Sequence, residues 1–156
     1  MQRLAIALVC ALGSIVAAAA TPDAALNAPI HAFIDSFNHG DAAAARAAHS
    51  SGDVSIIDEV PPFRWQGRDA FKAWSDDLAA DATKNGITDQ WVALGDVVRQ
   101  ESAGDRAYVV VQAVYTFKQN GTPMREAAQM TFALRKEGDS WRIAGWTWTG
   151  PPPQPQ

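Results

Sequence analysis

Cysteine is nearly absent from this sequence, and its absence excludes several kinds of site. The single cysteine, Cys10, lies in an N-terminal segment that we expect to be removed. The mature chain would then have no disulfide and no thiolate nucleophile or metal ligand. The three histidines, His31, His39 and His49, lack the H-x-x-x-H or H-x-H spacing that brings two imidazoles to one zinc ion. P-loop and dinucleotide motifs are missing too, so we expect no metal and no cofactor.

Basic residues are also scarce. The chain has 13 lysines and arginines against 17 aspartates and glutamates, with a formal net charge of −4. No basic cluster occurs along it, whereas a protein that binds nucleic acid needs lysines and arginines to neutralise phosphates. We therefore expect no nucleic-acid partner.

Long hydrophobic runs are missing except at the start of the chain. Residues 1–20, MQRLAIALVCALGSIVAAAA, combine a cationic start, a short apolar run and small residues before Thr21. This pattern is typical of a secretory signal peptide, and the run is too short to span a bilayer. We predict an exported protein, periplasmic or extracellular, that does not contact the membrane after cleavage. Residues 21–149 suit one domain, and the proline-rich tail 150–156 is expected to be disordered.

Helices are predicted in the first half of the mature chain. Apolar residues recur with helical spacing at Ile30, Phe33, Ile34 and Phe37. This stripe predicts a helix from Asn27, which could cap it, to His39. A second, short helix would begin at Asp41. A strand over 53–58 and a third helix from about Gly67 to Asn85 would follow.

The second half is rich in valine, threonine and aromatic residues, interrupted by glycine-containing turns. This pattern predicts four consecutive antiparallel strands, Thr88–Glu101, Arg106–Lys118, Met124–Lys136 and Ser140–Thr149. The expected fold class is α+β: a cone-shaped, curved antiparallel sheet, made of this four-strand meander plus the short first strand, wrapped on three N-terminal helices. Such a cone has a mouth in which a ligand could bind.

Four segments carry a family resemblance: FNHGDAAAA, the strand that ends on a carboxylate, GRDAF, and TFALRKEGDSWRIAGWTW. With these segments the chain resembles the nuclear transport factor 2-like superfamily, in the branch of SnoaL-like polyketide cyclases and ketosteroid isomerases. The resemblance covers about residues 24–149 and implies the cone fold. It leaves the function open, because this scaffold carries isomerases, dehydratases, cyclases and non-catalytic binding modules.

The ketosteroid isomerase pattern matches this chain only in part. Asp58 lies nine residues before Gly67, where the resemblance implies the general base. Phe33 and Met130 occupy the positions of the two oxyanion donors, and neither side chain can donate a hydrogen bond. Because the loss of one such donor costs a few kcal/mol of transition-state stabilisation, we do not expect steroid isomerisation.

Two residues are candidates for catalysis, and each has a simpler alternative. Asp58 could be a base whose pKa is raised by apolar neighbours, or an acid that solvates the end of a strand. His49 could approach the mouth of the cone, or could be an ordinary surface histidine at the end of a helix.

Aromatic residues are the main candidates for ligand contacts. The predicted ligand-binding residues are Phe33, Trp65, Tyr115, Gln129, Met130, Trp146 and Trp148. Strand alternation places Trp141 and Ile143 on one face and Trp146 and Trp148 on the other, unless a β-bulge near Gly145 changes the order. If both faces of the sheet are apolar, a second copy of the chain could cover the outer face, which predicts a homodimer.

Three functions remain open from the sequence. The first is an exported domain that binds a small, largely apolar molecule in an aromatic-lined cone. The second is a cofactor-independent isomerase, lyase or cyclase in which Asp58 abstracts a proton from an activated carbon. The third is a non-catalytic dimeric interaction module, which would be favoured if Trp65, Phe33 and Met130 filled the cone.

Overall fold

The computed structural model of the chain describes residues 23–156. The predicted signal peptide lies outside the described residues, so export remains a prediction. The helices are α1 (Ala24–Asn38), α2 (Ala42–Ala47) and α3 (Ala70–Asn85). The strands are β1 (Val54–Ile57), β2 (Arg64–Gly67), β3 (Ile87–Ala103), β4 (Arg106–Gln119), β5 (Thr122–Glu137), β6 (Ser140–Thr149) and β7 (Gln154–Pro155). None of the helices in the described part is long and apolar enough to cross a membrane.

The helix ends follow local capping chemistry, with one difference from the prediction. Asp23, rather than Asn27, caps α1: its carboxylate accepts a hydrogen bond from the Ala25 N–H at 2.8 Å. An aspartate is as good a cap as an asparagine, and its charge also suits the helix dipole. Asn27 instead lies inside α1 and donates to the Asp23 carbonyl oxygen at 2.7 Å. The predicted end of α3 is confirmed, because Gly86 takes the left-handed conformation with φ of 63°.

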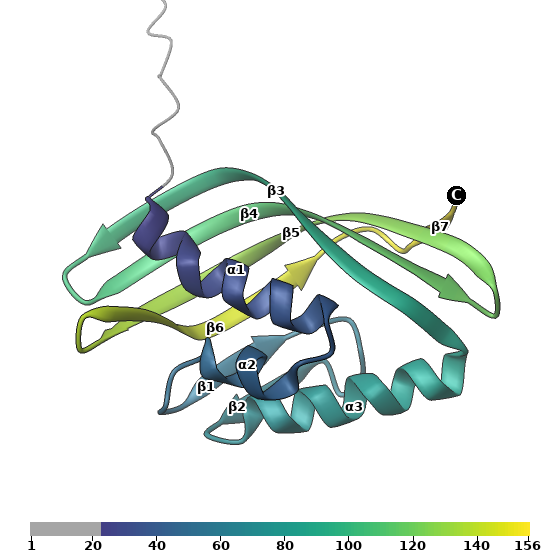
Figure 1. Cartoon of the computed structure of the whole chain (residues 1–156), viewed down its shortest axis with the longest axis horizontal. Helices are drawn as coiled ribbons and strands as arrows, with labels where there is room; N and C mark the ends of the chain where they lie inside the picture. Colours follow the sequence, from purple (N-terminus) through teal and green to yellow (C-terminus); the bar gives the residue numbers. More distant parts are fainter. Residues whose placement is uncertain (1–22) are drawn as a thin grey trace, which may run out of the picture.

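The sheet confirms the predicted α+β cone and adds two short strands. Its order is β2-β1-β6-β5-β4-β3, and β7 pairs with β5. The meander β3 to β6 is antiparallel throughout, whereas β1 pairs with β6 in parallel. Strand β2, which was not predicted, forms a hairpin with β1 and lies at the edge of the sheet (Figure 1).

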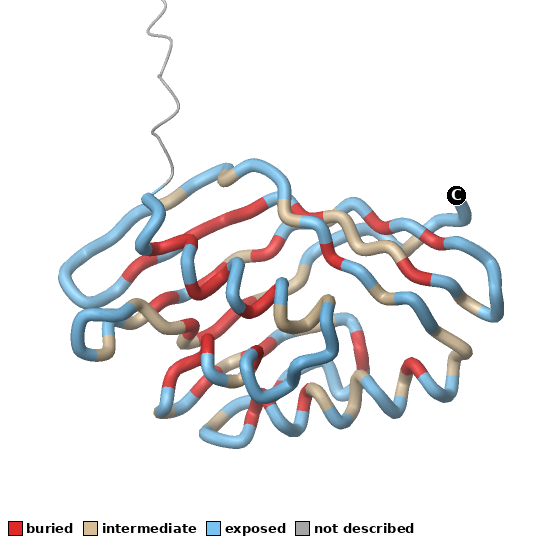
Figure 2. Tube along the Cα trace, viewed as in Figure 1, coloured by how far each residue is buried: buried red, intermediate tan, exposed pale blue. Residues whose placement is uncertain are grey.

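The helices cover the concave face of the curved sheet. Helix α1 lies across the strands, and α3 runs along the edge below it (Figure 1). Buried residues follow the inner side of α1 and the middle of β4, β5 and β6, where helices and sheet meet (Figure 2). Among the fully buried side chains are Ile30, Phe33, Phe132 and Ile143.

A β-bulge in β6 changes the predicted order of the tryptophans. Ala133 pairs with Gly145 but Leu134 pairs with Ile143, so Ala144 is an extra residue in β6. The bulge brings Ile143 and Trp146 into the same core, and Trp141 and Trp148 pack against that core. The prediction that Trp141 lies on the opposite face from Trp146 and Trp148 is therefore wrong. The cause is a β-bulge next to Gly145, which was the exception stated with that prediction. Because the tryptophans of β6 all pack on the core side, this strand gives no evidence that the outer face of the sheet is apolar.

The C-terminal tail is ordered, in contrast with the prediction. Strand β6 ends at Thr149, opposite Gln129, and leaves the first half of β5 without a neighbour on that side. The chain turns through residues 150–153, and Gln154 and Pro155 pair with Arg125 and Met124. The Gln156 N–H donates to the Pro123 carbonyl oxygen at 3.0 Å. Gln156, which follows Pro155, thus supplies a backbone donor that a proline would lack.

Candidate functional site

A cavity of about 420 Å³ remains between the helices and the concave face of the sheet. Its aromatic wall consists of Phe33, Phe37, Trp74, Tyr115, Phe117, Trp146 and Trp148. Gly150, Pro152 and Pro153 of the ordered tail line it as well. Volume and lining are those of a small-molecule pocket, which is mostly apolar with a few polar groups. The cone is open, and the filled cone that would favour an interaction module is not observed.

Asp58 lies in the wall of this cavity, directly after β1. Its Oδ2 accepts a hydrogen bond from the Trp74 Nε1–H at 2.7 Å, and its Oδ1 accepts one from the Glu59 N–H at 2.8 Å. Burial raises the pKa of Asp58, and these two hydrogen bonds partly oppose the rise. Asp58 therefore faces inward as a partly buried carboxyl group and does not simply solvate the end of the strand.

Glu59 and Glu126 form a second acidic group next to Asp58. Glu126, on β5, is 1% exposed, and its Oε1 accepts a hydrogen bond from the Trp148 Nε1–H at 2.7 Å. Its Oε2 is buried and has no hydrogen-bond donor within residues 23–156. Burial and the charge of Glu126 raise the pKa of Glu59 to about 8, and burial also raises the pKa of Glu126. The two carboxyl groups therefore retain a proton at neutral pH.

Tyr115 and Gln90 supply neutral polar groups. The Tyr115 hydroxyl donates to Gln90 Oε1 at 2.6 Å, and both residues line the cavity. Burial and the charge of Asp58 raise the pKa of Tyr115, so the phenol stays neutral over the physiological range.

Five of the seven predicted ligand-binding residues line the cavity: Phe33, Tyr115, Met130, Trp146 and Trp148. The other two do not. Gln129 is exposed on the opposite face of β5 from Met130, because side chains alternate along a strand. Trp65 on β2 is buried against α3, and its Nε1–H donates to Asp77 Oδ2 at 2.8 Å.

His49 is a core residue behind the cavity wall. It is 2% exposed and does not belong to the lining residues. Its Nδ1 lies 2.9 Å from the Ala45 carbonyl oxygen, and its Nε2 accepts from the Trp146 Nε1–H at 3.1 Å, so Nδ1 carries the proton. Burial lowers the pKa of His49 to about 4. Because both nitrogens are engaged, the structure gives the predicted catalytic role no support.

Several residues of the cavity wall, and the buried Glu126 behind that wall, were missed from the sequence. Glu126 shares the inner face of β5 with Met124 and Met130, so strand alternation could have revealed it as an acid on an apolar face. Trp74 on α3 lines the cavity and was not among the predicted ligand-binding residues. Asp81 on the same helix also lines the cavity, and Asp77 accepts a hydrogen bond from Trp65. Within the described part of the chain, no group of three or more His, Cys, Asp or Glu residues could hold a metal ion.

Solved structures share this fold. A ketosteroid isomerase-like protein from Erwinia carotovora atroseptica is 22% identical, with a TM-score of 0.64 over 83% of this chain and 96% of its own. A hexachlorocyclohexane dehydrochlorinase, LinA type 2, is 12% identical, with a TM-score of 0.70 over 85% and 87%. An NTF2-like protein with a cystatin-like fold from Novosphingobium aromaticivorans is 19% identical, with a TM-score of 0.62 over 80% and 78%.

Sequence comparison identifies the family. A search among curated proteins gave no match. The model of the SnoaL-like domain family matches residues 26–147. This range includes α2, α3 and the strands β1 to β5, together with all but the first two residues of α1 and all but the last two residues of β6. The chain belongs to the SnoaL-like domain family.

Proposed function

We propose that this protein is an exported domain that binds a small, largely apolar molecule in its cone. The observation that carries the proposal is the open cavity of about 420 Å³ with seven aromatic residues in its wall. Burial of apolar ligand surface against these rings would supply most of the affinity, and the few polar groups would orient the ligand.

Binding can be tested by isothermal titration calorimetry with a panel of steroids, aromatic acids, aromatic alcohols and aromatic amines. We expect at least one class to bind. In Leu78→Trp, a bulky side chain from α3 would fill the cavity that Leu78 lines and abolish that binding. Ala80→Trp, at an exposed position of the same helix, is the matched control and should bind normally. Equal binding by both variants would place the ligand elsewhere and contradict the proposal.

A second candidate function is proton abstraction from an activated carbon, as in an isomerase, lyase or cyclase. It is favoured by the inward position of Asp58 and by the rise of its pKa on burial, which suits a carboxylate to act as a base. Similar folds include a protein described as ketosteroid isomerase-like and a dehydrochlorinase. Because Phe33 and Met130 cannot stabilise an oxyanion, the substrate itself must have an acidic C–H bond.

Hydrogen–deuterium exchange tests this second function separately from binding. Ligands from the panel that carry an acidic C–H bond would be incubated in D₂O with the protein, and exchange would be followed by NMR. Asp58→Asn should slow the exchange by about 100-fold or more, since a positioned base contributes on that scale. Asp53→Asn, which changes an exposed acid before β1, should not. Unchanged exchange in Asp58→Asn would exclude the base role and leave the binding proposal standing.

We also propose a homodimer through the outer face of the sheet. On β4 this face carries Tyr108, which is 42% exposed, and the half-buried Val114, whereas Val110 between them is already buried within the chain. Light scattering coupled to size exclusion would give the mass in solution. A dimer that becomes a monomer in Val114→Lys supports this interface, and a monomeric natural chain contradicts it.

A further inference from the structure

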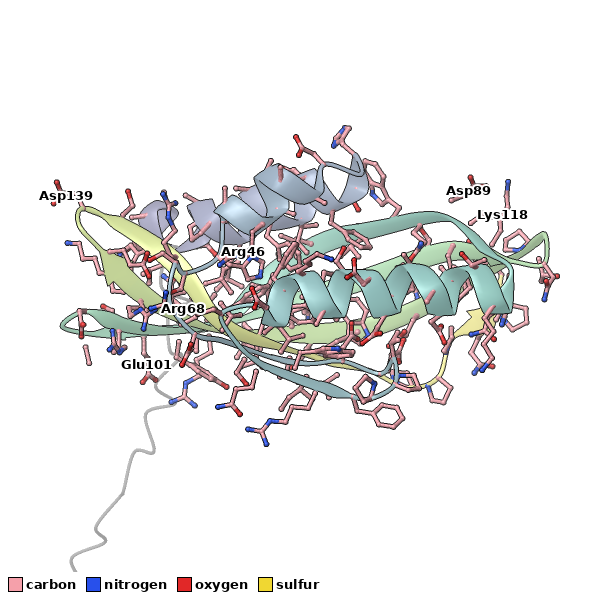
Figure 3. The ribbon with its side chains drawn as sticks, turned by 90° about the horizontal axis from the view of Figure 1, so that it is seen from below. Arg46, Arg68, Asp89, Glu101, Lys118 and Asp139 are labelled. Atoms are coloured by element: carbon pink, nitrogen blue, oxygen red, sulfur yellow. The ribbon has the colours of Figure 1, made fainter. Side chains whose placement is uncertain are left out.

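The charged residues in the cavity wall are all acidic. Asp58, Glu59 and Asp81 line it, whereas none of the described residues in its wall is a lysine, arginine or histidine. Lys118 follows the lining residue Phe117 in β4 but is exposed and forms an ion pair with Asp89 at 2.8 Å. Asp89 and Lys118 lie together at the periphery of the molecule (Figure 3). The acids in the cavity therefore have no cationic partner within its wall.

Behind the cavity wall, Glu126 adds a buried acceptor that lacks a donor. Glu126 is not itself a lining residue, but it adjoins Glu59 and Trp148, which are. Its Oε2 has no hydrogen-bond donor within residues 23–156, although the residue is 1% exposed. The neighbouring Glu59 can bond to it only if one of the two carboxyl groups is protonated. A buried charged acceptor without a donor is costly, so Glu126 needs either a proton shared with Glu59, which is itself exposed, or a donor brought by a ligand.

Aromatic rings are fixed next to these acids. Trp74 donates its indole N–H to Asp58, and Trp148 donates its own to Glu126. The Tyr115 ring lies 6.0 Å from the Trp148 ring. Tryptophan and tyrosine rings attract cations, most strongly where water is excluded.

From this arrangement we propose that the ligand is a cation, namely an apolar molecule that bears a protonated amine, with the ammonium group at Glu59 in the cavity wall, next to the buried Glu126, and the apolar part among the tryptophans. The proposal rests on the proposed binding function and specifies its ligand class. An ammonium group supplies both the missing charge and the missing donor. An organic cation is favoured over a metal ion, because the described residues offer no metal-binding group and the rest of the wall is apolar.

Binding of such a ligand should release a proton. The ammonium group would take the place of the proton that Glu59 and Glu126 hold, and the pKa of Glu59 is raised to about 8 in the empty cavity. The other titratable groups that face this pair are Asp58, Asp81 and Tyr115. Tyr115 stays neutral, and the carboxylates would favour the cation further. Affinity for an amine should therefore increase as the pH rises from 6 to 8, while the amine itself remains protonated.

Three probes that differ in charge test the proposal: phenylbutylamine, phenylbutanol and phenylbutyrate. Titration calorimetry at pH 8 should show that the amine binds about tenfold more tightly than the alcohol, the scale of one charge-assisted hydrogen bond, and that the acid binds least. At pH 7, titrations in phosphate and in Tris should differ in heat for the amine alone, because a proton is released to the buffer.

Two variants locate the charge. Glu126→Gln keeps an oxygen for the Trp148 N–H and should weaken the preference for the amine and remove the proton release, while phenylbutanol binds as before. Asp139→Asn changes an exposed acid in the turn between β5 and β6, well away from Asp89 and Lys118 (Figure 3), and should change neither.

The outcomes separate this inference from the function on which it rests. If the alcohol or the acid binds as well as the amine, the cavity is a ligand site but the cationic ligand is wrong. A preference for the amine and a proton release that are both unchanged in Glu126→Gln also contradict the inference. If none of the three probes binds, the inference fails, and the Leu78→Trp experiment with the wider panel still decides the proposed function.

Discussion

At the scale of single residues, Asp58 and His49 differ in what their hydrogen bonds leave free. Both are partly or fully buried, and both are bound by a tryptophan N–H. Asp58 accepts two hydrogen bonds and still faces the cavity, so its carboxylate can meet a ligand. His49 uses one nitrogen as donor and the other as acceptor, which leaves nothing for a ligand. The positions of Asp58 and His49 in the sequence could not show that one faces the cavity and that the other has both ring nitrogens engaged.

His49 should contribute to stability in a pH-dependent way. In His49→Phe, the Trp146 N–H and the Ala45 carbonyl lose their partner, which we expect to cost about 1–3 kcal/mol at pH 7. Burial lowers the pKa of His49 to about 4 in the folded state, so the unfolded chain binds the extra proton between pH 6.5 and 4. The stability that His49 contributes is thus lost as the pH falls through this window. Urea unfolding at pH 7 and at pH 4 should show that the difference in free energy of unfolding between the natural chain and His49→Phe is smaller at pH 4. An equal difference at both pH values would contradict a neutral, buried histidine.

Trp74 should influence the pKa of Asp58, the proposed base. Its hydrogen bond to Asp58 opposes the rise of the Asp58 pKa that burial causes. In Trp74→Phe that pKa should therefore rise further, and the pH profile of Asp58-dependent exchange should move to higher pH. Trp91→Phe, at a position that is 48% exposed, is the control and should leave the profile in place. A loss of rate in Trp74→Phe without a shift along the pH axis would indicate that the tryptophan only supports packing.

At the scale of elements, helices and the long meander could be predicted, because their signals are local: apolar spacing, caps and turn glycines. Strand β2 and the paired tail could not, and the bulge near Gly145 could be stated only as an alternative, because each depends on a neighbour in space. The tail pairs only because β6 ends opposite Gln129 and leaves an edge of β5 free. The same limit applies to the site. Asp58 followed from the family spacing, whereas the pairing of Glu59 with Glu126 depends on how the loop after β1 meets β5.

The contact between β1 and β6 should be sensitive to side-chain size at Gly145. A Cβ atom at Gly145 would lie 2.7 Å from the backbone oxygen of Ser55, which is closer than such atoms can approach. Gly145→Ala should push β1 away from β6 and destabilise the fold by about 1–3 kcal/mol. It should also weaken binding in the cavity, because β1 leads into Asp58 and Glu59. Thr147→Ala, on the same strand, adds no atom and serves as the control; unfolding measurements that show equal stability for the two variants would contradict this view of the β1–β6 contact.

At the scale of the whole molecule, the acidic cavity should make the empty protein less stable at high pH. The pKa of Glu59 is raised to about 8, so the folded state holds a proton that the unfolded chain has released above pH 4.5. Stability should therefore fall as the pH rises toward 8, most clearly above pH 6.5, where the opposing effect of His49 has ended. Thermal unfolding should show this decrease in the natural chain and a weaker one in Glu126→Gln. A melting temperature that stays constant or rises between pH 6.5 and 8 in the natural chain would contradict the shared proton.

The most direct test of the cavity and its charge is a crystal structure of the protein grown with phenylbutylamine. We expect the phenyl group among Trp74, Trp146 and Trp148, and the nitrogen within hydrogen-bonding distance of Glu59 or Glu126, with Asp58 in the cavity wall. A cavity filled by its own side chains, or Asp58 and Glu59 turned outward into solvent, would contradict the account.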